Sequence, residues 1–186
     1  AVFSPAHFLI PKIQRLYRLS APPTFLPNLI DVPTTLPLKP QRPTFTFLAR
    51  WDRRKRPWLF FDLAKAFPAY RFIAIGQGSA SAEAEETQRL RNQYQDVQNL
   101  ELPGFINRFQ DPQRLQRLLS DTWVLVNTAA REGLPLSFLE AAAYGCAILS
   151  AVDPDQFASR FGQHVIKNNF EVAISEYSKS IKIQYV

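Results

Sequence analysis

Short apolar runs alternate with amphipathic segments from residue 44 to residue 152. We predict strands at five apolar runs of four to six residues, namely Thr44–Ala49, Arg71–Ile75, Asn99–Leu102, Thr122–Asn127 and Ala147–Val152. Helices are predicted between them, at Trp58–Phe67, Glu83–Asp96, Pro112–Leu119 and Leu136–Tyr144, with Asp111 as the cap of the third. This alternation indicates an α/β fold of the doubly wound type, with a mostly parallel sheet.

The predicted strands are continuous apolar runs, which indicates that helices cover both faces of the sheet. In sheets of this kind, ligands bind outside the carboxyl ends of the strands. Candidate chemistry is therefore expected in the loops that follow Ala49, Ile75, Leu102, Asn127 and Val152.

Proline divides the chain in two, because nine of its 15 prolines lie in residues 1–43. Proline has no amide donor and a fixed φ, so neither a helix nor a central strand is expected through Ala21–Pro43. We interpret residues 1–43 as a proline-rich lead-in or interdomain connector, with a short helix predicted at Ile10–Leu19, and residues 44–186 as the folded domain. Methionine is absent even at position 1, which indicates a piece of something longer.

Composition narrows the class of protein without selecting a ligand. Hydrophobic residues make up 46% of the chain, enough to bury a core, which excludes wholesale disorder. A net charge of +6 is compatible with phosphate-bearing ligands, nucleic acid or an anionic membrane surface. The single cysteine, Cys146, excludes a disulfide framework and is expected to be a small buried side chain. No apolar run reaches the roughly 18 residues of a membrane-spanning helix.

The loop after the first predicted strand, Arg50–Arg56, has five cations in seven residues. It leads into a helix N-terminus, whose free amides and dipole favour anions. Like charges crowded there are costly unless an anion neutralises them, so we predict phosphate binding in preference to a merely solvated turn. The second strand ends in Gly76-Gln77-Gly78, which is weak evidence alone and equally typical of a tight turn.

The segment Asn127–Gly145 is the most informative part of the chain. Glu132 lies in the loop after a predicted strand, and Glu140 lies in the helix that follows. An unpaired carboxylate on the apolar, alanine-rich stretch around Glu140 would be expensive to bury, which favours a functional role. Free backbone amides are expected beside the two glutamates, at Gly133, Leu134 and Leu136.

Glu132 and Glu140, with seven residues between them in EGLPLSFLE and followed by AAAYGCAIL, resemble the E-x7-E segment of retaining glycosyltransferases of family 4. Four further segments are similar to elements of that family in the same order: FLPNLIDVP, FLARWDRRKRP, FIAIGQG and LELPGFI. Together they cover about Thr24–Ser150. The resemblance implies a Rossmann-like donor-binding domain, one half of a GT-B enzyme whose first domain is missing from this chain.

The resemblance also implies roles for individual residues. Arg50, Lys55 and Glu132 would be catalytic: the two cations would neutralise the diphosphate of a UDP-sugar or GDP-sugar without a metal or other cofactor, and Glu132 would hold the sugar hydroxyls. Glu140 would accept hydrogen bonds from the ribose hydroxyls. The remaining implied contacts to sugar, phosphates and base are Gly76, Phe105, Ile106, Gly133, Leu134, Pro135, Leu136 and Ser137.

The partners implied are a nucleotide-sugar donor and a glycan or lipid-linked acceptor, the latter bound by the missing first domain. A cytoplasmic location is expected, and peripheral contact with the inner face of the membrane is compatible with it. Nucleic acid is not expected as a partner, because the basic charge is confined to one turn and no nucleic-acid motif is visible.

Two alternative functions stay open. A non-catalytic nucleotide-binding module would bind without turnover, whereas a basic nucleic-acid-binding domain would show steep salt dependence and indifference to Glu140. Asp153-x-Asp155, which stands where many family members have a glycine-rich loop, imitates a metal-binding D-x-D motif. Asp153 before Pro154 is better explained as a helix cap, so we predict no metal site.

Overall fold

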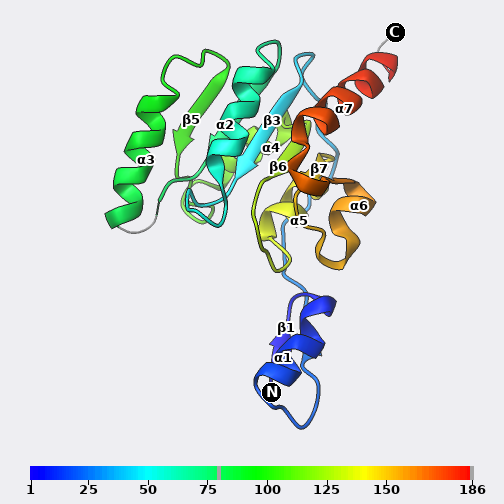
Figure 1. Cartoon of the computed structure of the whole chain (residues 1–186). Helices are drawn as coiled ribbons and strands as arrows, with labels where there is room; N and C mark the ends of the chain where they lie inside the picture. The colour runs from blue at the N-terminus through cyan, green and yellow to red at the C-terminus, as the bar shows by residue number, and fades with distance from the viewer. Residues whose placement is uncertain (79–80, 185–186) are drawn as a thin grey trace.

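The computed structural model of the chain describes residues 1–78 and 81–184. Within them lies a six-stranded sheet in the order β5-β4-β3-β6-β7-β8, in which all neighbouring strands are parallel. The strands are β3 (Thr44–Leu48), β4 (Arg71–Ile75), β5 (Leu100–Gly104), β6 (Val124–Asn127), β7 (Ala147–Ser150) and β8 (Gly162–His164). The predicted doubly wound parallel sheet is confirmed (Figure 1).

Helices and short 3-10 turns connect these strands. They are α2 (Pro57–Ala66), α3 (Ser81–Gln93), α4 (Pro112–Asp121), α5 (Leu136–Ala143), η2 (Pro154–Gln156), α6 (Phe157–Phe161), η3 (Ile166–Asn168) and α7 (Phe170–Gln184). Local sequence explains where α4 starts, because Pro112 occupies the first turn and the Asp111 carboxylate accepts a hydrogen bond from the Arg114 amide at 3.1 Å. The predicted Asp111 cap is therefore confirmed.

The sequence patterns missed the last part of the domain. Strand β8 is three exposed residues, Gly-Gln-His, so it carries no apolar run that would mark it as a strand. It forms because Gly162–His164 pairs in register with Ile148–Ser150 of β7, a contact made after the chain has folded back. Gly162 lies so close to this neighbour that a Cβ there would be 2.2 Å from the Ile148 carbonyl oxygen.

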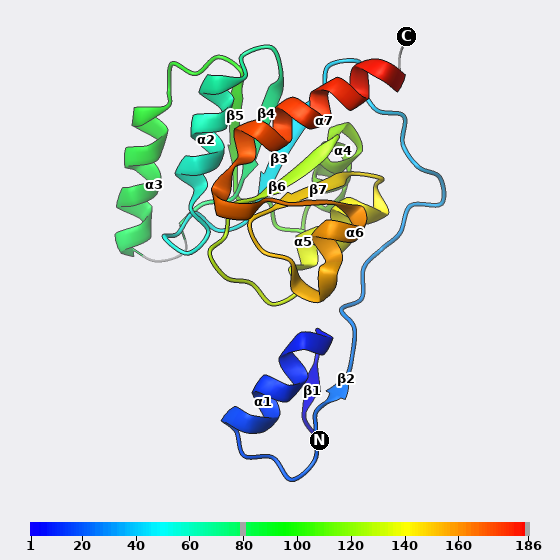
Figure 2. The same ribbon diagram turned by 45° about the vertical axis from the view of Figure 1, so that its right-hand side comes forward.

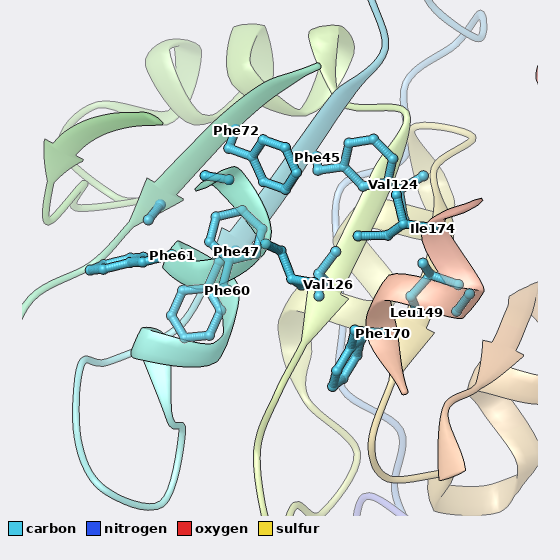
Figure 3. Packing of buried hydrophobic residues seen from close by; sticks show 14 of the residues in the cluster. Phe45, Phe47, Phe60, Phe61, Phe72, Val124, Val126, Leu149, Phe170 and Ile174 are labelled. Carbon is cyan, nitrogen blue, oxygen red and sulfur yellow. The ribbon is translucent and has the colours of Figure 1, made fainter. Parts of the chain in front are cut away.

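Helices cover both faces of the sheet, as the continuous apolar strands predict. On one face, side chains of β3, β4 and β6 such as Phe45, Phe72 and Val126 pack against α2 and α7 (Figure 3). On the other face, alternate residues of the same strands pack against α4 and α5, including Ile73 with Leu119 and Leu125 with Phe138 in one buried cluster. Alternate positions within a strand therefore belong to two separate cores.

The strand order places a crevice at the carboxyl edge of the sheet. The chain enters at β3 in the middle, runs outward to β5, and then returns to build β6, β7 and β8 on the other side of β3. The loops after β3 and β6 therefore leave in opposite directions at the point where the order reverses. Doubly wound sheets bind their ligands at this position.

Residues 1–26 form a small N-terminal unit beyond the carboxyl edge of the sheet (Figures 1 and 2). It consists of β1 (Phe3–Ser4), η1 (His7–Leu9), α1 (Ile10–Leu16) and β2 (Thr24–Phe25), and β1 and β2 pair in parallel. The short helix predicted at Ile10–Leu19 is present but ends at Leu16. Residues 27–43 run along the domain without helix or strand, as the prolines predict (Figure 2).

The Asp153-x-Asp155 segment has two structural functions. The prediction that Asp153 caps the helix starting at Pro154 is wrong: its carboxylate makes no cap hydrogen bond in η2. It instead accepts hydrogen bonds from the backbone amide and hydroxyl of Ser159 in α6. The Asp155 carboxylate reaches the N-terminal unit and accepts hydrogen bonds from the amides of His7 and Phe8, at 2.7 and 2.8 Å. These are the first amides of η1, so Asp155 caps a helical segment from 148 positions away in the sequence.

Candidate functional site

A cavity of about 540 Å³ lies at the carboxyl edge of the sheet, where the fold predicts a ligand. Its walls come from the loops after β3, β4, β5 and β6 and from the first turn of α5. The lining residues are Leu48, Ala49, Arg50, Lys55, Ile75, Gly76, Gln77, Phe105, Ile106, Asn107, Arg108, Phe109, Glu132, Pro135, Leu136 and Ser137. We refer to it as the larger cavity.

Gly76 allows this wall to close. Its amide donates to the Gly104 carbonyl at 2.9 Å, and its φ of +140° is one that residues with a side chain rarely adopt. A Cβ at this position would lie 1.9 Å from the Ala49 carbonyl oxygen. Glycine therefore brings the ends of β3, β4 and β5 together beside the cavity.

An ion pair between Lys55 and Glu132 joins two loops across the larger cavity. Both side chains are mostly buried, with 15% and 10% of their surfaces exposed. Asn127, the last residue of β6, donates a second, longer hydrogen bond to the same Glu132 oxygen at 3.4 Å. The predicted cation and carboxylate therefore face the same space, and each partly neutralises the other.

Backbone contacts hold the basic loop against the loop after β6. The Thr128 hydroxyl donates to the Lys55 carbonyl at 2.7 Å, and the Ala130 amide donates to the Arg54 carbonyl at 2.8 Å. Within the basic loop, Asp52 accepts a hydrogen bond from the Lys55 amide at 2.8 Å. The backbone of the basic loop is thus held in place before any ligand binds, and Glu132 holds the Lys55 ammonium, which lowers the cost of ordering this side chain.

Glu140 faces a second, smaller cavity of about 270 Å³ on the α4 side. Its Oε1 accepts a hydrogen bond from Arg108 Nη1 at 2.9 Å, whereas its Oε2 is buried without a hydrogen-bond partner. Burial raises the pKa of this carboxyl group, and the Arg108 charge acts in the opposite direction. The residues lining this smaller cavity are Leu29, Ile30, Asp31, Arg108, Phe109, Pro112, Leu115, Gln116, Leu119, Leu136, Glu140 and Tyr144.

The structure brings most of the predicted site residues together. Those that line the larger cavity are Arg50, Lys55, Gly76, Phe105, Ile106, Glu132, Pro135, Leu136 and Ser137. Glu140 lines the smaller cavity, next to Leu136, which lines both. Gly133 and Leu134 line neither of these two cavities: Leu134 packs on the buried cluster beneath α5, and a Cβ on Gly133 would lie 3.5 Å from Leu9 of the N-terminal unit.

Sequence reasoning missed two charged residues at these cavities. Arg108 lines both of them, and Asp31 lines the smaller one from the connector. A lone arginine in a loop carries no sequence signal until the fold brings it to Glu140, 32 positions later. Asp31 lies within the FLPNLIDVP segment, whose resemblance to the family concerns the segment as a whole and assigns no role to this side chain.

No helix in the described residues is both long and apolar enough to cross a membrane.

A search of curated protein sequences returned no match. Among solved structures, three similar chains are the lipopolysaccharide outer core galactosyltransferase WaaB, TarM of S. aureus, and the sucrose-phosphate synthase of Thermosynechococcus elongatus. Their sequence identities are 24%, 19% and 20%, and their TM-scores are 0.58, 0.62 and 0.60.

At these identities the likeness shows the fold, which is the Rossmann-like domain of GT-B glycosyltransferases. The alignments cover 80%, 91% and 80% of this chain but only 42%, 34% and 39% of the three proteins, so the chain spans less than half of their length. The family model described as "Glycosyl transferases group 1" matches residues 33–177, which is most of the chain. This protein chain therefore belongs to the group 1 glycosyl transferases.

Proposed function

We propose that this chain carries the donor-binding domain of a retaining glycosyltransferase of family 4. The reaction moves a hexosyl unit from a UDP-sugar or GDP-sugar to a glycan or lipid-linked acceptor. The observation that carries the proposal is the larger cavity, where Arg50 and Lys55 from one loop and Glu132 from another meet the N-terminus of α5. The structures of TarM and of the pneumococcal O-GlcNAc transferase GtfA, which share the fold, are described as complexes with UDP.

The chemical difficulty in this reaction is the charge that builds on the departing diphosphate. Arg50 and Lys55 supply positive charge at the place where that charge develops, and the free amides at the start of α5 add to it. Lys55 is neutralised by Glu132 in the structure. A bound donor would divide the pair, with the diphosphate beside Lys55 and the sugar hydroxyls hydrogen-bonded to Glu132.

Glu140 is the proposed ribose contact. Its buried Oε2 has no hydrogen-bond partner within the protein, and a buried carboxylate oxygen in that state is costly. Ribose hydroxyls would supply the missing donors. Leu136 lines both the larger cavity and the smaller cavity that contains Glu140, so the two spaces adjoin. One nucleotide could therefore extend from one cavity into the other.

The proposed division into domains rests on the structure of the N-terminal unit. A parallel two-stranded sheet is an unusual isolated structure, because parallel sheets are normally covered on both faces. Phe3 and Phe25 on its two strands are exposed, as is Leu26 directly after β2. We therefore keep residues 1–43 as the lead-in and connector and residues 44–186 as the donor domain. Within the lead-in, we assign residues 1–26 to the edge of a preceding domain that would bind the acceptor.

Calorimetry with UDP and GDP tests the proposed function directly. We expect one of them to bind, with unchanged affinity in EDTA because cations of the chain neutralise the diphosphate, and with weaker affinity at high salt. Arg50→Ala or Lys55→Ala should each cost ~1.5–3 kcal/mol, or roughly 10-fold to 150-fold in affinity. Arg160→Ala, which removes an exposed arginine of α6, is the matched control. Unchanged affinity in both loop variants contradicts the proposal.

A second set of variants distinguishes the proposed roles of Glu132 and Glu140. Glu140→Gln removes the charge that the ribose hydroxyls favour, so affinity for the free nucleoside diphosphate should fall. Glu132→Gln should spare the free nucleotide and weaken binding of the nucleotide sugar instead. Equal losses of UDP or GDP affinity in both variants would mean that the roles are assigned wrongly. Sugar transfer should be absent from the chain alone, because the proposed acceptor domain is missing.

A further inference from the structure

Arg108 occupies the boundary between the two cavities. It lies in the loop between β5 and α4, lines both spaces, and has about a third of its side chain (34%) exposed. Its Nη1 is 2.9 Å from Glu140 Oε1, and only 14% of the Glu140 side chain is exposed. The carboxylate of the ion pair is therefore mostly shielded from water. Shielding from water strengthens its electrostatic interaction with Arg108.

The surroundings of Glu140 would otherwise disfavour its charge. Leu115, Leu119 and Leu136 line the same cavity and offer no hydrogen bond to a carboxylate. The titratable neighbours are Asp31 from the connector and Tyr144, which follows α5. Burial raises the pKa of the Tyr144 hydroxyl, and the charges of Asp31 and Glu140 raise it further. Among the described residues that line this cavity, Arg108 is the one cation.

A second cation, Lys39, lies at the C-terminal end of α5 and is bound to other groups. The Lys39 ammonium, from the connector, donates to the backbone carbonyl of Tyr144 at 2.8 Å and to the carbonyls that end α4. Burial lowers the pKa of Lys39, and its neighbours Cys146 and Asp121 oppose that shift. Lys39 therefore stabilises the helix ends, and the charge of Glu140 depends on Arg108.

We propose that Arg108 is a positioning residue for nucleotide binding: it holds one oxygen of Glu140 and leaves the second oxygen to accept the ribose hydroxyls. The inference rests on the proposed function, since it takes Glu140 as the ribose contact. The geometry fits this division, with Oε1 bound to Arg108 and Oε2 buried without a partner. Without Arg108, the buried carboxyl group would hold its proton to a higher pH and would present a weaker acceptor to the ribose.

The pH dependence of binding distinguishes positioning from the alternatives. Calorimetry measures the UDP dissociation constants of Arg108→Met and of the unchanged chain from pH 6.5 to pH 9. We compare their ratio at each pH, because the titration of UDP itself affects both constants equally and cancels. We expect a loss of about tenfold at the acid end of this range, and the loss should shrink as the pH rises and Glu140 ionises. Arg108→Lys, which keeps a positive charge, should lose less at every pH.

A loss that is the same at all pH values would overturn the inference, because a direct phosphate contact or a purely structural role predicts that result. No loss at any pH would overturn it as well. The double variant Arg108→Met with Glu140→Gln should bind no worse than Glu140→Gln alone, because the two residues act as one unit. Thermal unfolding of each variant identifies any that fails to fold.

If neither UDP nor GDP binds, the proposed function is refuted, and the role of Arg108 must be tested without a nucleotide. Carbon-13 NMR of the glutamate carboxyl groups follows Glu140 directly, with Glu140→Gln used to assign its signal. Arg108→Met should move the midpoint of the Glu140 titration to higher pH. A midpoint that does not move would overturn the positioning role without any reference to nucleotide.

Discussion

Gly76 illustrates how one residue can determine the shape of the site. The strands beside it converge until its Cα lies against the Ala49 carbonyl, where an added Cβ would be 1.9 Å from the oxygen. The clash involves backbone rather than the end of a flexible side chain, so β3 or β4 would have to move. The same position has φ of +140°, which adds conformational strain for any residue with a Cβ.

Gly76→Ala should therefore reduce the free energy of unfolding by at least ~2 kcal/mol, since it combines backbone strain with a steric clash. The measurement is urea denaturation monitored by circular dichroism. Gly133→Ala is the matched control, because its new Cβ would meet only Leu9 Cδ1, at an ordinary 3.5 Å. Equal stability of the two variants would show that the strand ends can separate without cost.

At the scale of elements, helices α4 and α5 end beside each other, and the connector joins their ends. The last carbonyls of a helix have no partner within it and carry the negative end of its dipole. The Lys39 ammonium donates to Leu119 O at 3.4 Å and Ser120 O at 3.3 Å from α4, and to Tyr144 O at 2.8 Å from α5. One cation from the connector thus satisfies carbonyls of both helices.

Lys39→Met keeps most of the side-chain volume but removes these hydrogen bonds, so we expect a loss of ~1–3 kcal/mol in stability. Differential scanning calorimetry measures the shift in the melting temperature. Lys12→Met on α1 is a suitable control, because Lys12 is an exposed lysine on a helix of the N-terminal unit. If both variants melt at the same temperature as the unchanged chain, the connector is not anchored by Lys39.

At the scale of the whole molecule, Asp155 links the N-terminal unit to the donor domain. Asp155 and Gln156 both have positive φ, at 50° and 59°, a conformation that non-glycine residues adopt at some cost. The Asp155 carboxylate accepts hydrogen bonds from two amides of the N-terminal unit, which offsets part of that cost. The contact holds the N-terminal unit beyond the carboxyl edge of the sheet (Figure 1). The larger cavity lies at the same edge.

Asp155→Ala should release the N-terminal unit while leaving the sheet intact. The amides of His7 and Phe8 would lose their acceptor, so we expect their hydrogen exchange to become about tenfold faster, as for the loss of a hydrogen bond worth ~1.4 kcal/mol. Asp111→Ala is the control, since it removes the cap of α4 and leaves these two amides unaffected. Unchanged exchange at His7 and Phe8 would contradict a fixed arrangement.

Much of the fold follows from local sequence, because its signals are local. Runs such as RFIAI predict a strand at β4 with its observed bounds, and Asp111-Pro112 predicts the start of α4. The strand ends locate the loops correctly, which is why the sequence alone predicts that Arg50, Lys55, Gly76 and Glu132 lie near one another. The chemical roles of these residues stay predictions, as does the division into domains.

The layers of this protein follow from local sequence, since apolar periodicity and caps act over a few residues and need no distant partner. Which side chains share a charge or a hydrogen bond depends instead on the tertiary fold. Arg108 meets Glu140 across 32 positions, and Asp155 meets His7 across 148. Strand β8 likewise forms only against β7. The reason is that an ion pair or an edge strand is stabilised by its partner, and the fold alone brings that partner within reach.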